Sequence, residues 1–165
     1  MHGTIEGFIR FKENTGQPHL LYLVGRTKDT PYLLSLLAEA EKRGYKDAIV
    51  RTGFISENDL LSMIKGACAL VFCSLAEGFG LPVAEAMSMG VPVITSTIPV
   101  LAEVAGDAAL LVDPNDYDGL AHAMERIAND ESLRKALVAK GYERARLYAW
   151  EKAGPEFVKV VRSLI

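Results

Sequence analysis

The sequence predicts an α/β fold in which an open, doubly wound parallel sheet of about five strands carries helices on both faces. Short runs rich in Val, Ile, Leu and Phe alternate with helical stretches. These runs are continuously apolar, which is typical of strands buried on both faces. Strands that alternate with helices favour parallel pairing through right-handed crossovers. The predicted strands are His19–Val24, Ala48–Thr52, Ala69–Cys73, Pro92–Thr95 and Ala109–Val112.

Local signals predict where the helices begin and end. Thr30 can cap a helix that has Pro31 at its first position, and Gly44 can end it. Pro82 can begin another helix, which Gly90 can end in the left-handed conformation. Trp150 is expected to anchor the last helix by burying its large ring. The further predicted helices are Thr4–Lys12, Glu57–Lys65, Asp116–Ala128, Glu131–Leu147 and Trp150–Leu164, so the C-terminus adds extra helices to the sheet.

Size and composition indicate one domain. The chain has 165 residues, and its net charge of −3 gives no reason to expect electrostatic capture of nucleic acid. Its apolar runs are too short to span a bilayer, and no signal-peptide pattern is visible at the N-terminus. Cys68 and Cys73 lie in an apolar stretch, without a metal-binding spacing. We therefore expect a cytoplasmic domain with two reduced thiols and no metal.

The richest candidate site follows the third predicted strand. Ligands of open parallel sheets bind outside the carboxyl ends of the strands. There, the segment Ser74–Leu81 contains two glycines and leads directly into the helix that Pro82 opens. Glycines allow close approach of the backbone, and free N–H groups at a helix start favour an anion. The segment therefore predicts a phosphate site.

Two carboxylates frame this segment, with seven residues between Glu77 and Glu85. Carboxylates accept hydrogen bonds from the vicinal hydroxyls of a sugar or ribose. A phosphate with a sugar on each side describes a nucleotide-diphosphate sugar. Taken singly, the residues leave an alternative equally open: Glu85 only complements the helix N-terminus, and Glu77 is a solvated loop residue.

The segment Phe72–Ile94 closely resembles the signature of retaining glycosyltransferases of the GT-B type, in the glycosyl transferases group 1 family. It contains Glu-Gly-Phe-Gly-Leu-Pro, Glu-Ala-Met and Gly-Val-Pro-Val, and the two carboxylates match the E-x7-E motif of that family. The resemblance covers roughly residues 19–165. It implies that residues 1–165 form the Rossmann-like, nucleotide-sugar-binding domain, without the N-terminal acceptor domain and the first strand.

The resemblance also implies residue roles. Glu77 is the expected catalytic residue and contacts hydroxyls of the donor sugar, whereas Glu85 contacts the ribose. The basic pair that binds the diphosphate in this family has no clear match, because Arg26 and Lys28 fit solvated or rim positions better. The implied donor-binding residues are Gly53, Phe54, Ile55, Ser74, Glu77, Gly78, Phe79, Gly80, Leu81 and Glu85.

The implied function is that of the donor-binding domain of a hexosyltransferase-like enzyme, which transfers a sugar from a nucleotide-diphosphate sugar with retention. No cofactor or metal is expected, and the isolated chain should be inactive or nearly so. The expected partners are the nucleotide sugar and an N-terminal acceptor domain or separate subunit, and any membrane association would come through that missing half. An uncovered sheet edge favours self-association. The alternative is a non-catalytic nucleotide-binding or interaction module that has kept the fold.

Overall fold

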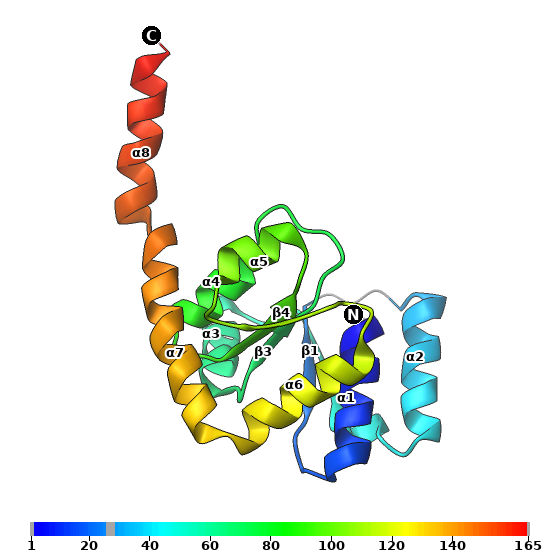
Figure 1. The fold of residues 1–165 in the computed structure, drawn as a ribbon. Coiled ribbons are helices and arrows are strands. Elements are labelled where there is room, and N and C mark those ends of the chain that lie inside the picture. The colour runs from blue at the N-terminus through cyan, green and yellow to red at the C-terminus, as the bar shows by residue number, and fades with distance from the viewer. Residues whose placement is uncertain (1, 26–28, 165) are drawn as a thin grey trace.

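The computed structural model describes residues 2–25 and 29–164 (Figure 1). All five predicted strands are present: β1 (Leu21–Val24), β2 (Ile49–Gly53), β3 (Leu70–Phe72), β4 (Val93–Ser96) and β5 (Leu110–Val112). The α-helices are α1 (His2–Thr15), α2 (Pro31–Lys42), α3 (Glu57–Gly66), α4 (Leu81–Ser88), α5 (Pro99–Ala105), α6 (Tyr117–Asn129), α7 (Glu131–Ala145) and α8 (Trp150–Ser163). Two 3₁₀ turns complete the set, η1 (Lys46–Ala48) and η2 (Arg146–Tyr148).

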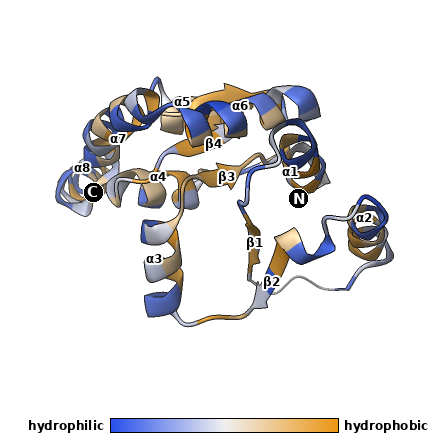
Figure 2. Ribbon diagram, turned by 90° about the horizontal axis from the view of Figure 1, so that it is seen from below, coloured by the Kyte–Doolittle hydropathy of each residue, from blue (hydrophilic) through white to orange (hydrophobic). Residues whose placement is uncertain are grey.

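The strands pair in parallel, as predicted, but they form two ladders. β1 pairs with β2, and β3 pairs with β4, which pairs with β5. Within the described residues no ladder joins β1 to β3, and Figure 2 shows the two groups apart. The chain passes from β2 to β3 through α3, and β3 then pairs with β4 rather than with the first ladder. The predicted number of strands is therefore correct, but the described strands form two ladders instead of one continuous sheet.

Both faces of the second ladder are covered by helices. Along β4, Val93 packs into a cluster with α4 and α5, whereas its neighbour Ile94 packs into a cluster with α1 and α6. Val71 and Phe72 of β3 divide in the same way. Successive strand residues point to opposite faces, so this division requires helices on both sides of the sheet. The doubly wound architecture predicted from the sequence is thus confirmed.

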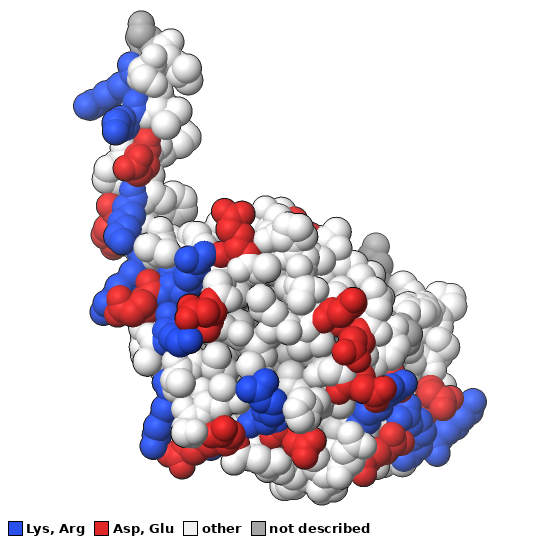
Figure 3. Space-filling view, viewed as in Figure 1, with Lys and Arg blue, Asp and Glu red and all other residues white. Residues whose placement is uncertain are grey.

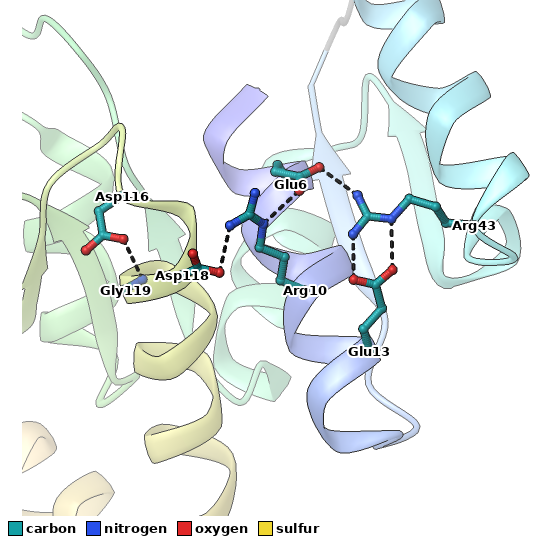
Figure 4. A network of polar contacts seen from close by, with 7 residues as sticks. All are labelled: Glu6, Arg10, Glu13, Arg43, Asp116, Asp118 and Gly119. Atoms are coloured by element: carbon teal, nitrogen blue, oxygen red, sulfur yellow. Dashed lines mark hydrogen bonds and ion pairs between the residues drawn. The ribbon is translucent and has the colours of Figure 1, made fainter.

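Ion pairs hold α1 between α2 and α6 (Figure 4). The Arg43 guanidinium donates to Glu13 at 2.6 Å and to Glu6 at 2.9 Å. Arg10 contacts Glu6 at 2.8 Å and Asp118 at 2.7 Å. The hydrogen bond from Arg43 is the main cause that lowers the pKa of the Glu13 carboxyl below its usual range. The network therefore fixes the first helix to elements from both halves of the chain.

The predicted helix signals are confirmed by their geometry. The Thr30 hydroxyl accepts a hydrogen bond from the Leu33 backbone N–H at 3.1 Å, and Pro31 is the first residue of α2. Gly44 and Gly90 follow the ends of α2 and α4 with φ of 81° and 74°, in the left-handed region. Glycine adopts this region without the steric cost that a Cβ imposes.

The last helix differs from its prediction in one respect. α8 exists, but it extends away from the body of the molecule (Figure 1). Trp150, expected as a buried anchor, is 85% exposed, and Phe157 is 70% exposed. The chain leaves the body after η2, so the Trp150 ring has little of the described fold to pack against.

Candidate functional site

The loop between β3 and α4 is tied to the core by two serines. The Ser96 hydroxyl, on fully buried β4, donates to the Ser74 carbonyl at 2.7 Å. The Ser74 hydroxyl in turn donates to Glu77 Oε1 at 2.7 Å. Ser74 and Glu77 are half-buried. One oxygen of the predicted catalytic carboxylate is thus held in place at the carboxyl end of β3.

The loop enters α4 through a turn that requires glycine. Gly80, the N-cap residue of α4, has φ of 96° and ψ of 44° in the left-handed region. A Cβ at this position would overlap Leu101 Cδ2, and Leu101 is fully buried. Because Gly80 has no side chain, it cannot cap α4 as Thr30 caps α2. Pro82 has no N–H, and the Val83 N–H donates to the Gly80 carbonyl at 2.9 Å, so this end of α4 offers an anion its helix dipole and the Leu81 N–H.

The second predicted carboxylate belongs to the same element. Glu85 lies just beyond the first turn of α4 and is exposed, as are Gly78, Phe79 and Leu81. The structure therefore brings Ser74, Glu77, Glu85 and the glycine turn together on one loop and helix.

The predicted base-binding segment lies on the other ladder. Gly53 ends β2 with φ of 67°, and its carbonyl accepts a hydrogen bond from the Gly25 N–H at 3.1 Å. Phe54 is 77% exposed, and Ile55 is half-buried. Arg26 and Lys28 lie outside the described residues. The candidate site is therefore divided, with its carboxylates on the second ladder and Gly53–Ile55 at the end of the first.

One contact to the loop was missed by the sequence reasoning. The ring of Tyr148, in η2, meets the ring of Phe79 edge-on, with centroids 5.3 Å apart and planes at 88°. The two residues are far apart in the sequence, and no spacing rule connects them. Only their aromatic character could have marked them as partners.

Two hollows among the described residues contain none of the predicted site residues. One of about 220 Å³ lies between β5 and α6 and is lined in part by Asp113, Asp116, His122 and Arg126. The other, of about 420 Å³, is lined in part by Asp107, Lys140, Glu143 and Arg144. Basic and acidic side chains are interspersed on the face shown in Figure 3. No described group of three or more His, Cys, Asp or Glu side chains could hold a metal ion.

Among the described helices, none is long and apolar enough to cross a bilayer. Cys68 is exposed and Cys73 is buried, and burial raises the pKa of the Cys73 thiol to about 12. A buried thiol of such high pKa is a poor nucleophile.

The parallel α/β fold, with helices on both faces and a glycine-rich loop leading into a helix, is the Rossmann-like fold of GT-B glycosyltransferases. Residues 1–144 match the family described as Glycosyl transferases group 1, and the chain belongs to this family.

Relatives and solved structures agree with this assignment. O-antigen chain mannosyltransferase B of Escherichia coli is 35% identical over 130 residues, which cover 78% of this chain and 34% of that protein. The structure of sucrose-phosphate synthase from Thermosynechococcus elongatus has a TM-score of 0.84 at 28% identity and covers 99% of this chain and 42% of that one. The C-terminal domain of the group 1 protein LpcC from Francisella tularensis has a TM-score of 0.79 at 25% identity, over 88% of this chain and 76% of that one. The matched part of this chain covers 34% and 35% of the length of two curated relatives, 40% of a third and 14% of a fourth.

Proposed function

We propose that this chain binds a nucleotide-diphosphate sugar as the donor-binding domain of a retaining glycosyltransferase. The observation that supports this function best is the loop–helix element after β3. It carries an anchored carboxylate at Glu77, an exposed carboxylate at Glu85, and between them the glycine turn that begins α4. Membership of the glycosyl transferases group 1 family supports a sugar-transferring reaction for the protein to which this domain contributes.

The proposed roles follow from the chemistry of each group. The diphosphate lies against the glycine turn and the N-terminus of α4, where the positive end of the helix dipole lowers its energy. Glu85 accepts hydrogen bonds from the ribose hydroxyls. Glu77 contacts the donor sugar, and its bond from Ser74 fixes which oxygen remains available. Because these groups are protein donors and acceptors, the proposal includes no metal or organic cofactor.

The sugar is proposed from the relatives. Mannosyltransferases of Escherichia coli and Salmonella typhimurium are 35% and 36% identical to this chain. We therefore place a mannose donor first, within a panel of GDP-mannose, UDP-glucose and ADP-glucose. Titration calorimetry of the chain with each donor and its nucleoside diphosphate identifies the nucleotide and the sugar.

Glu85→Ala tests the ribose contact. A hydrogen bond to a charged group contributes about 1.5–3 kcal/mol, so nucleotide affinity should fall by about one to two orders of magnitude. Glu131→Ala is the matched control, because Glu131 is also exposed and lies near the start of a helix, α7. Equal affinities for the Glu85 variant and the wild type would remove Glu85 from the site.

Glu77→Gln tests the sugar contact. The variant should lose more affinity for the nucleotide sugar than for the bare nucleoside diphosphate, because Glu77 lies on the loop side of the glycine turn. The ratio of the two affinities is the measurement. An equal loss for both ligands would show that Glu77 does not touch the sugar.

We expect transfer itself to need more than this chain. Departure of the nucleotide develops charge that basic groups must stabilise, and the acceptor must be held near the anomeric carbon. Since the matched part of this chain covers 34% and 35% of two curated relatives, we propose that another domain or subunit supplies the acceptor site. Products from a donor panel and generic acceptors, read by mass spectrometry, should show slow donor hydrolysis at most. Multiple-turnover transfer by the chain alone would contradict this proposal.

A further inference from the structure

We propose that Tyr148 is a positioning residue that sets the conformation of the loop Glu77–Gly80 through its contact with Phe79. Tyr148 lies in η2, immediately before the chain continues into α8. The inference rests on the proposed function in one respect, namely that this loop contacts the donor.

The contact has the geometry of a specific aromatic pair. The two ring centroids are 5.3 Å apart, and the planes are nearly perpendicular, at 88°. Edge-to-face pairs at this separation are stabilised by their ring quadrupoles beyond the area they bury. Phe79 is 39% exposed, so the Tyr148 ring supplies a specific contact for a side chain that would otherwise face solvent more fully.

Tyr148 is itself held firmly. Its hydroxyl donates to the Glu103 carbonyl at 3.3 Å, and the Arg144 guanidinium lies over its ring, 5.7 Å from the centroid. Arg144 Nε donates to the Val104 carbonyl at 3.0 Å, and its Nη2 donates to the Glu103 carbonyl. These bonds tie the last turn of α7 and η2 to the carboxyl end of α5. A ring fixed in this way can hold Phe79 in a defined position.

The loop needs such a support at its centre. Its first residue, Glu77, is fixed by Ser74, and the carbonyl of its last, Gly80, accepts a hydrogen bond from the Val83 N–H at 2.9 Å. Gly78 lies between them in open space, with no atom within 4 Å of the position a Cβ would take. Since glycine restricts the backbone least, Phe79 is the side chain that can fix the middle of the loop.

Amide hydrogen exchange on the free protein tests this positioning without any ligand. The Val83 amide reports opening of the loop, because its N–H donates to the Gly80 carbonyl at 2.9 Å. Loss of an aromatic pair should make opening of the loop about 2- to 12-fold more favourable, so Tyr148→Leu should speed exchange of this amide by that factor. Tyr148→Phe keeps the ring and loses only the bond to Glu103, so it should retain most of the protection. Tyr142→Leu is the matched control, because Tyr142 lies on α7 and its hydroxyl is next to Gly90, at the end of α4 opposite to the loop.

A double substitution makes the test specific to the pair. If Tyr148 acts through Phe79, the Phe79→Leu/Tyr148→Leu protein should exchange no faster in the loop than Phe79→Leu alone. Additive effects, or equal acceleration in Tyr142→Leu, would overturn the inference. A general structural role for Tyr148 would also overturn the inference. It would appear as faster exchange throughout β4 in Tyr148→Leu, together with loop exchange in Tyr148→Phe that is as fast as in Tyr148→Leu.

Binding then separates this inference from the proposed function. With GDP-mannose, UDP-glucose and ADP-glucose as probes, Tyr148→Leu should weaken binding of the nucleotide sugar more than that of the nucleoside diphosphate, and Tyr148→Phe should restore it. Normal loop exchange in Tyr148→Leu overturns the positioning role whatever binds. Faster loop exchange in Tyr148→Leu, together with a wild-type protein that binds no probe, overturns the donor function instead.

Discussion

Gly80→Ala should be among the most damaging small substitutions in this chain. An L-residue in the left-handed region costs about 1–2 kcal/mol, and Gly80 has φ of 96°. The new methyl would also overlap the fully buried Leu101, and overpacking a core costs about 1–3 kcal/mol. Reduced freedom of the unfolded chain returns about 0.4–1 kcal/mol. The net loss of unfolding free energy should therefore be about 1–4.5 kcal/mol.

Two other glycines separate the two causes. Gly44 has φ of 81° but no atom within 4 Å of the position that a Cβ would take, so Gly44→Ala reports backbone strain alone. Gly78 has neither a positive φ nor a close neighbour, so Gly78→Ala should change stability by less than about 1 kcal/mol. Gly80→Ala should be the least stable of the three.

Urea unfolding followed by far-UV circular dichroism is the suitable assay. The single tryptophan, Trp150, is 85% exposed and reports poorly on the core. A Gly80→Ala protein as stable as Gly78→Ala would refute the reasoning. Equal losses for Gly80→Ala and Gly44→Ala would show that Leu101 moves aside and that only the backbone strain is real.

Two further predictions concern charge and thiols. Arg43 lowers the pKa of Glu13 in the folded protein, so the unfolded state binds the proton more readily. The stability that this ion pair contributes is therefore fully present above the pKa of Glu13 in the unfolded state. It is lost as the pH falls through the lower pKa of Glu13 in the folded state. The stability difference between wild type and Glu13→Gln, from urea unfolding, should therefore shrink between about pH 6 and about pH 3; a constant difference would contradict it. Iodoacetamide at about pH 8 should modify exposed Cys68 in the native protein and Cys73 only after unfolding, as peptide mass spectrometry would show; fast labelling of native Cys73 would contradict its burial.

The sequence predicted those features that depend on neighbours along the chain. Apolar runs located all five strands, and Thr30 and Gly90 marked helix ends because caps are local. The burial on both faces that these runs predicted is complete only along β4, since Tyr22 and Val24 of β1 are 48% and 40% exposed and Leu111 of β5 is 39% exposed. The first helix was predicted over Thr4–Lys12, whereas α1 extends over His2–Thr15, since its ends carry no strong signal. The candidate loop was also found from sequence, because its glycines and carboxylates are contiguous.

Features that depend on distant neighbours could not be predicted. An apolar run marks a strand but does not identify the strand it pairs with, so the division into two ladders was not foreseen. Trp150 was expected to be buried because of its size, but burial requires a surface to pack on, and α8 leaves the body. The contact between Phe79 and Tyr148 has no local signature.

The two serine hydroxyls that tie the loop to β4 have a consequence for the energetics of binding. Ser96 and Ser74 hold the Glu77 carboxylate before any ligand arrives. A side chain and loop that are already in place lose little conformational entropy when they contact a ligand. The free energy of their contacts with the ligand is then reduced less by the cost of ordering them. Ser96→Ala would leave the chemistry of every ligand-facing group unchanged. It would nevertheless make binding entropically less favourable, because the loop would then order at the moment of capture.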